Sequence, residues 1–265
     1  MTQRKDKYKK RVVIKVGTNV MTNKDNRIVQ PILKRLVDQI AVLYERDIIS
    51  VLVSSGSVIA GKEVMGRGSL DISDKTIRRQ VYSAVGQPRM MRHYYSIFHD
   101  YGMRCAQVLA TKRDFAPGKH RENMINCYEG LISQGVIPIA NEDDAVSLSM
   151  SMFTDNDELA SLVAELIDAD MLILLTDTDG LFNGHPDDEA SEMIKHVKAD
   201  QKVEQYIQET NKGEAEGRGG MESKLGVAKK TAKKNIPTFI ANGKWDNVII
   251  DIVDGKEVGT RITAE

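Results

Sequence analysis

The sequence predicts an α/β fold in which a largely parallel sheet is covered by helices on both faces. Short apolar runs of strand length alternate along the chain with amphipathic segments of helix length. These runs are apolar nearly throughout, as expected of strands buried on both sides. A chain of 265 residues with ordinary globular composition can also bury a core that needs neither disulfides nor a structural metal.

The strands are predicted from five apolar runs. After the first run, Pro31 suits the first turn of a helix whose apolar residues from Leu33 to Tyr44 recur at helical spacing. A second amphipathic helix, with apolar residues from Leu159 to Ile167 on one face, separates the last two runs. The five runs are Arg11–Gly17, Ile48–Ser54, Cys105–Ala110, Val136–Ala140 and Met171–Thr176.

Three segments interrupt this alternation. Thr18–Gln30 contains a turn-forming polar run and predicts a hairpin. Val248–Ile262 carries Asp254-Gly255 between two β-rich runs, which is a stronger hairpin signal. The polar stretch Asn183–Glu216 predicts surface loop and helix. The chain thus combines the alternating pattern with peripheral additions.

Composition excludes several classes of function. The formal net charge is -1 and no basic face is evident, so we expect no nucleic-acid partner. No apolar run approaches a membrane span and the charged start lacks a secretory signal, so we expect a cytoplasmic protein without a membrane partner. No linker divides the chain. We therefore expect one domain over residues 1–265, with two lobes, 1–168 and 169–265, that share one sheet.

One glycine-rich segment imitates a nucleotide-binding motif. The run from Gly56 to Lys62 follows a strand and nearly matches the Walker A phosphate loop. That motif needs Ser or Thr after the lysine, and Glu63 would repel phosphate instead. A glycine turn that places Ser55 and backbone N–H groups at the start of a helix remains a credible anion site.

Four other segments contain more charged, amide and glycine residues than their place in the fold requires. Lys15 and Gly17 stand at the carboxyl end of the first strand, where ligands bind in open α/β sheets. Asn141–Ala145 follows a buried strand, and Phe153–Asp157 precedes a helix with more acid and amide groups than one N-cap needs. Gly217–Lys224 joins a glycine-rich turn to the positive end of a helix. A solvated loop explains any one of these segments, but not all four together.

Taken together, the motifs resemble the amino acid kinase family, and within it the branch that phosphorylates glutamate. The similarity extends from about Arg11 to Arg261, and it is the order and spacing of the motifs that make it specific. The motifs are Val13–Thr18, Val53–Gly56, Ala84–Gln87, Ala106–Leu109, Asn141–Val146, Asp155–Asp157, Leu175–Asp177 and Gly219–Met221 with Lys224.

The resemblance implies a three-layer αβα sandwich, with glutamate bound by residues 1–168 and ATP by residues 169–265. By this resemblance Lys15 and Lys224 flank the transferring phosphoryl group and Asp157 holds both lysines in place. The glutamate-binding residues would be Ser55, Gly56, Asn141, Asp144 and Asn156. The nucleotide-binding residues would be Lys15, Gly17, Thr176, Asp177, Arg218, Gly219, Gly220, Met221, Glu222, Ser223 and Lys224.

The family also implies cofactors and partners. ATP would act as its Mg²⁺ complex without a dedicated protein metal site, and the product would be L-glutamyl 5-phosphate, the first intermediate of proline biosynthesis. Proline is implied as a feedback inhibitor, a homo-oligomer (dimer or tetramer) as the assembly, and glutamyl phosphate reductase as a functional partner.

Departures from the family pattern leave some assignments open. Asp143 stands where the family often has Asn, and Arg218 stands where bacterial members have Thr. Within residues 1–265 we expect no C-terminal RNA-modification-like domain. The alternatives are another member of the family, such as an acetylglutamate or carbamate kinase, and a catalytically silent amino-acid-binding regulatory module. The presence of Lys15, Lys224 and Asp157 argues against the silent module.

Overall fold

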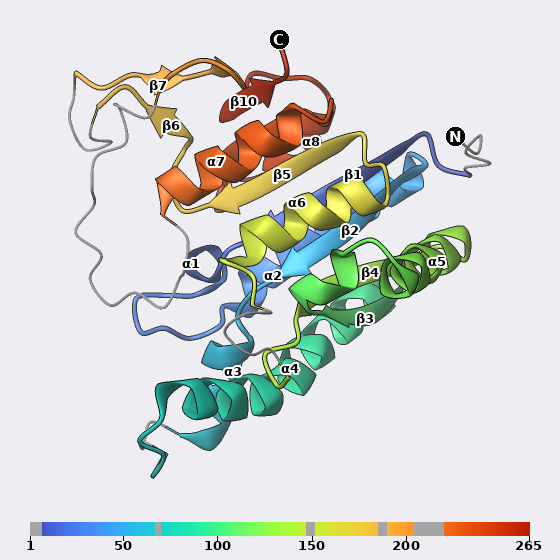
Figure 1. The fold of residues 1–265 in the computed structure, drawn as a ribbon, viewed down its shortest axis with the longest axis vertical. Coiled ribbons are helices and arrows are strands. Elements are labelled where there is room, and N and C mark those ends of the chain that lie inside the picture. Colours follow the sequence, from blue (N-terminus) through green and yellow to red (C-terminus); the bar gives the residue numbers. More distant parts are fainter. Residues whose placement is uncertain (1–6, 67–69, 147–151, 185–189, 204–219) are drawn as a thin grey trace.

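A central sheet of eight strands organises the part of the chain that the computed structural model describes, which is residues 7–66, 70–146, 152–184, 190–203 and 220–265 (Figure 1). The strand order is β3-β4-β2-β1-β5-β9-β10-β8. The strands are β1 (Lys10–Val16), β2 (Ile48–Ser54), β3 (Arg104–Ala110), β4 (Val136–Glu142), β5 (Met171–Thr176), β8 (His196–Lys198), β9 (Thr238–Asn242) and β10 (Thr260–Thr263).

The sheet is largely parallel, as the sequence predicts. Strands β3, β4, β2, β1, β5 and β9 all pair in parallel, while β10 runs antiparallel to β9 and parallel to β8. All residues of β2 and β5 are buried, which explains why these runs carry no polar alternation. Because the strands are parallel, their carboxyl ends meet along one edge of the sheet.

Helices cover both faces of this sheet and give the expected three layers (Figure 1). One face carries α2 (Gln30–Glu45), α4 (Lys75–Asp100) and α8 (Val248–Val253). The other carries α5 (Lys119–Ser133), α6 (Asn156–Leu166) and α7 (Met221–Ala232). The short η1 (Lys112–Phe115) precedes α5, and a small separate hairpin pairs β6 (Leu181–Phe182) with β7 (Met193–Ile194). The predicted fold class is confirmed.

The helix that follows β2 is held in close contact with α4. Helix α3 (Ser57–Met65) packs along α4, and a Cβ atom added at Gly86 would lie 1.8 Å from the backbone oxygen of Ser57. Gly61 meets the backbone of Tyr82 equally closely. Only glycine permits this approach, since any larger residue would push the helices apart. The crossing sets where α3 begins.

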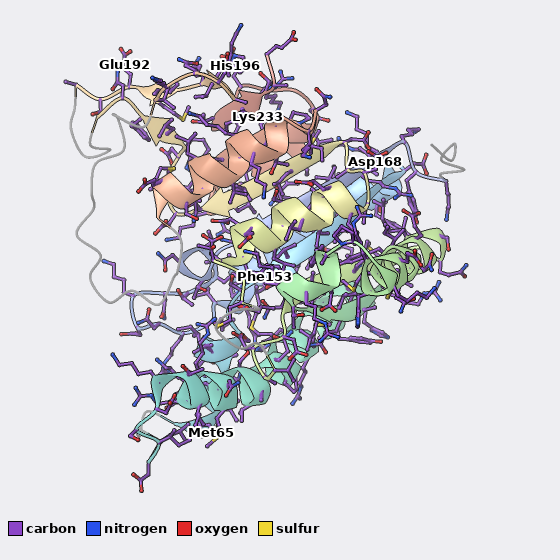
Figure 2. All side chains as sticks on the ribbon, in the orientation of Figure 1. Met65, Phe153, Asp168, Glu192, His196 and Lys233 are labelled. Atoms are coloured by element: carbon purple, nitrogen blue, oxygen red, sulfur yellow. The ribbon has the colours of Figure 1, made fainter. Side chains whose placement is uncertain are left out.

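Short loops at the sheet edge are shaped by local chemistry. Gly56 has φ of 99°, a left-handed conformation that turns β2 into α3. Asp155 caps α6 by accepting hydrogen bonds from the backbone N–H groups of Asp157 and Glu158. Phe153, labelled in Figure 2, is 2% exposed and packs edge-on against Phe115. The first turn of α6 therefore has a fixed position above the sheet.

The structure corrects three predictions about peripheral segments. Val248–Val253 forms helix α8 instead of the first arm of a hairpin, and Thr18–Met21 forms the short helix α1, with antiparallel pairing only between Thr22 and Ile28. In the described part of the stretch from residue 183 to 216, the structure adds the short strands β7 and β8 to the expected loop, and residues 185–189 and 204–216 lie outside the described residues. In α1 and α8, buried apolar residues pack against the core, and this packing outweighs local propensity.

Among the described residues, no helix is both long enough and apolar enough to cross a membrane. Two thiols, Cys105 and Cys127, are free, the first buried and the second exposed.

Candidate active site

A cleft opens where the carboxyl ends of the central strands face the amino ends of three helices. Lys15 and Gly17 come from the end of β1, Ser55 from the end of β2, and Asn141 and Thr176 from β4 and β5. Helices α3, α6 and α7 begin at the same place, so their positive ends point toward the cleft. The arrangement suits an anionic ligand.

Two lysines from distant parts of the chain meet at one carboxylate. Nζ of Lys15 lies 2.7 Å from Oδ1 of Asp157, and Nζ of Lys224 lies 3.0 Å from Oδ2 of the same residue. The side chain of Asp157 has no exposed surface, and those of the two lysines are 6% and 9% exposed. Asp157 thus sits behind the lysines, and both ammonium groups line the cleft.

Packing of α6 against α7 brings this triad together. Oγ1 of Thr231 on α7 donates a hydrogen bond to Oγ of Ser161 on α6 at 2.7 Å, and both groups are buried. At the start of the two helices, Oγ of Ser223 donates to Oδ2 of the cap residue Asp155 at 2.6 Å. The first bond joins the end of α7 to the middle of α6, and the second joins their first turns, so that Asp157 lies beside Lys224.

Burial and charge together set the protonation of the triad. Burial lowers the pKa of Lys15 below its ordinary value of 10.5; Asp157 opposes this effect, and the neighbouring Lys224 ammonium adds to it. Burial acts to raise the pKa of Asp157, but the two ammonium groups outweigh it and bring the pKa below the ordinary value of 3.8. Asp157 is therefore ionised at neutral pH. It places one negative charge between the two lysine side chains that line the cleft.

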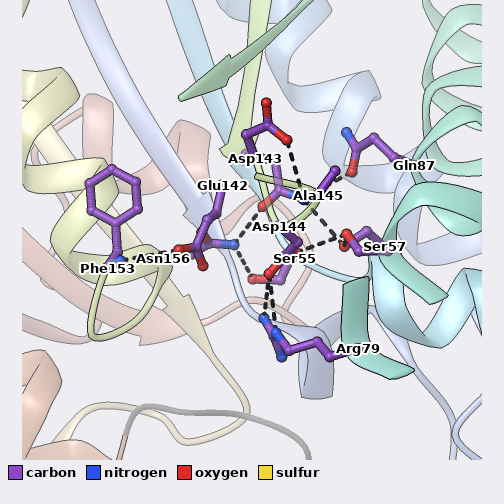
Figure 3. Close-up of polar contacts among 12 residues, drawn as sticks. Ser55, Ser57, Arg79, Gln87, Glu142, Asp143, Asp144, Ala145, Phe153 and Asn156 are labelled. Atoms are coloured by element: carbon purple, nitrogen blue, oxygen red, sulfur yellow. Dashed lines mark hydrogen bonds and ion pairs between the residues drawn. The ribbon is translucent and has the colours of Figure 1, made fainter. Parts of the chain in front are cut away.

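Next to the triad lies a network of neutral polar side chains (Figure 3). Nδ2 of Asn156 donates to Oγ of Ser55 at 2.8 Å and to Oδ1 of Asn141 at 2.9 Å. Nδ2 of Asn141 in turn donates to Oε1 of Gln87 at 2.9 Å, with a longer contact to Oγ of Ser57. The network holds the amide groups of β4 and α6 in fixed orientations beside the lysines.

An ion pair forms another part of the cleft wall. The carboxylate of Asp144 is 4% exposed. Its Oδ1 accepts a hydrogen bond from Nε of Arg79 at 3.1 Å and lies 3.0 Å from Nη2 of the same residue in an ion pair. Its Oδ2 accepts from Oγ of Ser83 at 2.8 Å. Figure 3 shows the Arg79 side chain extending from α4 toward Asp144. Arg79 itself is about one third exposed and lines the cleft.

Polar groups after β1 and β5 form the opposite wall. Oγ1 of Thr176 donates to Oδ1 of Asp177 at 3.2 Å, and Nδ2 of Asn19 donates to Oδ2 of Asp177 at the same distance. The backbone N–H of Gly17 bonds to the carbonyl of Leu175 at 3.3 Å, which joins the two strand ends. This wall holds hydroxyl, amide and carboxylate groups close to the lysines.

The structure gathers most of the residues singled out by sequence into this one cleft. Ten of them line it: Lys15, Gly17, Ser55, Gly56, Asn141, Asp144, Asn156, Thr176, Asp177 and Lys224. Gly220, Met221, Glu222 and Ser223 lie at the start of α7, where Met221 packs against the core and Glu222 is exposed. Arg218 and Gly219 lie outside the described residues.

The side chains at the end of the Walker-like segment, Lys62 and Glu63, contact neighbouring helices and loops and are not arranged to bind phosphate. The Lys62 ammonium lies over the ring of Tyr82, 5.6 Å from its centroid. Glu63 accepts a hydrogen bond from the backbone N–H of Ile28 at 2.6 Å and pairs with Arg89. Both side chains serve the packing of α3, in agreement with the interpretation of the sequence.

Sequence reasoning missed several cleft residues. Arg79 precedes the quoted Ala84–Gln87 motif and looks like any basic residue of an amphipathic helix, so nothing in the sequence marks it. Ser57 belongs to the Walker-like segment, and Asn19 follows the first strand, but residue type alone gives neither of them a separate role. The positions of these side chains follow from strand and helix packing, which residue type alone does not reveal.

Comparison with known proteins identifies the family. The model of the amino acid kinase family matches residues 10–242, and this chain belongs to that family. It is 41% identical to the glutamate 5-kinase of Bacteroides thetaiotaomicron over 92% of this chain and 66% of that protein. It is 37% identical to the glutamate 5-kinase of Chlorobaculum tepidum over 97% of this chain and 70% of that protein. The chain thus spans about two thirds of the length of these relatives. The resemblance inferred from the motifs is confirmed.

Solved structures support the fold independently. Carbamate kinase from Giardia lamblia bound to AMP-PNP has a TM-score of 0.71 at 17% identity, with 97% of this chain and 99% of that chain covered. Isopentenyl phosphate kinase from T. acidophilum has a TM-score of 0.67 at 16% identity, with 95% and 99% covered. Identities this low carry information about the fold alone.

Proposed function

We propose that this chain transfers the γ-phosphoryl group of ATP to the side-chain carboxylate of L-glutamate. The products are L-glutamyl 5-phosphate, the first intermediate of proline biosynthesis, and ADP. The observation that carries the proposal is the buried Lys15–Asp157–Lys224 triad at the carboxyl edge of the sheet. The similarity to two glutamate 5-kinases supports the choice of glutamate.

The reaction needs little from the protein beyond alignment and charge. A carboxylate is ionised at neutral pH, so no base has to remove a proton before attack. One of its oxygens forms a bond to the γ-phosphorus, the bond from that phosphorus to the β–γ bridging oxygen breaks, and ADP leaves with the electron pair. Lys15 and Lys224 stabilise the charge on the phosphoryl and bridging oxygens. Asp157 keeps the two ammonium groups oriented toward the cleft.

The two walls of the cleft divide the ligands between them. Ser55, Gly56, Asn141, Asp144 and Asn156, all within residues 1–168, would hold glutamate. Thr176, Asp177 and the start of α7, all within residues 169–265, would hold ATP together with Lys15 and Gly17. Arg218 and Gly219 belong to the same nucleotide assignment.

Magnesium would enter with ATP and would offset the charge of its phosphate groups. The described residues hold no group of three or more His, Cys, Asp or Glu side chains that could form a metal site. The carboxylates of Asp155 and Asp177 line the cleft and are oxygen donors of the kind that this ion prefers. These residues fit a metal ion held mainly by phosphate and water.

The proposal extends to partners and location. Proline shares the α-amino and α-carboxylate groups of glutamate and would compete for the same wall of the cleft as a feedback inhibitor. An acyl phosphate is prone to hydrolysis, which favours rapid use by glutamyl phosphate reductase. A homo-oligomer (dimer or tetramer) in the cytoplasm completes the proposal.

ADP release measured over a panel of carboxylates tests the reaction. Glutamate should be used and glutamine rejected by a factor of about 10⁴, because the amide is a poor nucleophile and leaves buried polar groups unpaired. Hydroxylamine should trap the product as a γ-hydroxamate. Equal ADP release with glutamate and glutamine would refute the assignment, and glutamate binding without ADP release would point to the silent module.

A further inference from the structure

Arg79 is a cation that has no role in the phosphoryl transfer proposed above. It lines the cleft from α4, about one third exposed. In the described part of the chain, the cations that line the cleft are Lys15, Lys224 and Arg79, and only Arg79 is not bound to Asp157. Its guanidinium is paired instead with the carboxylate of Asp144.

The guanidinium retains unused donors. A guanidinium has five N–H groups. Nε donates one of them to Oδ1 of Asp144, and Nη2 forms an ion-pair contact with the same oxygen at 3.0 Å. Asp144 is the one partner of the Arg79 side chain within the described residues. The ion pair thus fixes the plane of the guanidinium while leaving donors in a geometry that suits a carboxylate.

The Arg79–Asp144 pair also places opposite charges side by side. The α-carbon of an amino acid carries an ammonium and a carboxylate. Its ammonium can therefore face Asp144 while its carboxylate faces Arg79. Asp144 has lone pairs to accept from an ammonium beyond its bonds to Arg79 and Ser83. The neighbouring Ser55–Asn141–Asn156 network is neutral, so it supplies no full charge to balance an α-carboxylate.

We propose that Arg79 binds the α-carboxylate of the amino-acid substrate and so selects α-amino dicarboxylates over simple carboxylates. This inference rests on the proposed function, because it concerns the end of glutamate that does not react. The γ-carboxylate lies at the lysines, and the α-carboxylate at Arg79. Asp144 receives the α-ammonium group.

The test compares two substrates in two matched variants of the full chain. Arg79→Gln removes the proposed contact. Arg78→Gln makes the same substitution on the same helix at a residue that does not line the cleft. Each is assayed for ADP release with magnesium ATP and either glutamate or 4-aminobutyrate, which keeps the reacting carboxylate and the amine but lacks the α-carboxylate. Circular dichroism and thermal unfolding establish that each variant is folded.

Arg79→Gln should raise KM for glutamate roughly 10- to 150-fold, which is the worth of a charged hydrogen bond. KM for ATP should be unchanged. The preference for glutamate over 4-aminobutyrate, as a ratio of kcat/KM values, should fall by about the same factor, since the analogue has no α-carboxylate to lose. Arg78→Gln should match the wild type. If 4-aminobutyrate turns over too slowly, its inhibition constant against glutamate provides the comparison.

Two results would overturn the assignment. An unchanged KM for glutamate would show that Arg79 makes no substrate contact. An equal loss for both compounds would show that Arg79 acts only by holding Asp144, which contacts the amine that both compounds share. The wild-type arm reports separately on the proposed function, because absence of ADP release with glutamate there refutes the kinase assignment itself.

Discussion

Oδ1 of Asp157 lies 2.7 Å from Nζ of Lys15, although the carboxylate has no exposed surface and the lysine side chain is only 6% exposed. A lysine buried in a central strand would be strongly destabilising without a carboxylate partner. Asp157 serves Lys224 in the same way from its other oxygen. One acid thus allows two cations to stand at a nearly buried site where a phosphoryl group can meet both.

Loss of either lysine should impair chemistry more than folding. We expect Lys15→Ala or Lys224→Ala to lower kcat by roughly 10²–10³, as when one preorganised stabilising group is removed. The comparison is Lys34→Ala, whose side chain is 58% exposed on α2 and should leave kcat unchanged. Wild-type turnover in both folded site variants would contradict the role given to the lysines.

Removing the charge of Asp157 should destabilise the fold. Asp157→Asn leaves two nearly buried ammonium groups without their counter-charge, so we expect the free energy of unfolding in urea to fall by about 3–5 kcal/mol. Asp246→Asn is the control, because that carboxylate is 77% exposed and its pair with Arg35 contributes about 1 kcal/mol at most.

The pH dependence of stability gives an independent readout of the same group. The pKa of Asp157 is below 3.8 in the folded chain, so its ionised form contributes stability that is present above pH 3.8. That contribution is lost as the pH falls from 3.8 through the folded value. The unfolding free energy of Asp157→Asn should therefore fall less than that of the wild type as the pH is lowered below 3.8. An equal fall in the two proteins would show that other carboxylates cause the loss of stability in acid.

The crossing of α3 and α4 predicts a strong effect at one glycine. Gly86→Ala would bring a Cβ atom to 1.8 Å from the carbonyl oxygen of Ser57, a backbone atom that cannot rotate away. We expect a loss of about 3 kcal/mol or more in unfolding free energy, since overpacking forces the backbone to move. A displaced Ser57 would also weaken glutamate binding.

Gly130→Ala is the matched control for this prediction. Gly130 lies in α5 with nothing within 4 Å of an added Cβ, so the substitution should stabilise the fold by about 1 kcal/mol through helix propensity. Similar unfolding free energies for the two variants would refute the close approach of α3 and α4.

Activity should depend on magnesium supplied with ATP. Because the metal offsets phosphate charge, excess EDTA should abolish ADP release, and added Mg²⁺ should restore it. Thermal unfolding in EDTA without ATP should match that of the untreated protein, since the metal is expected to bind through the nucleotide. Full turnover in EDTA would remove magnesium from the scheme.

The central strands could be predicted closely from sequence. Ile48–Ser54 and Met171–Thr176 match β2 and β5 at both ends, because strands buried on both faces must be apolar throughout and are bounded by polar turns. An N-cap in the segment Phe153–Asp157 was also predicted, and the structure shows that Asp155 is the capping residue, accepting from backbone N–H groups two and three residues further on.

Peripheral elements were predicted less well because local propensity competes there with packing. Val248–Val253 is rich in β-branched residues, which favour a strand. Yet Val248, Ile249, Ile252 and Val253 lie on one face of a helix and are buried against α2 and the sheet. The pattern fits both structures, and only contact with the core decides between them.

The sequence by itself determined the parallel α/β fold, the family, and the motif residues of the cleft. Buried strands appear in it as continuous apolar runs, and the motifs appear as short segments in a fixed order and spacing. The resemblance to the family already implied that Asp157 holds Lys15 and Lys224. Only the tertiary structure decided the distances of these contacts, and that Arg79 pairs with Asp144. These contacts join residues far apart in the chain, so they depend on how α4, α6 and α7 pack on the sheet. Charge balance in the cleft is therefore a property of the assembled layers, which no single segment of the sequence contains.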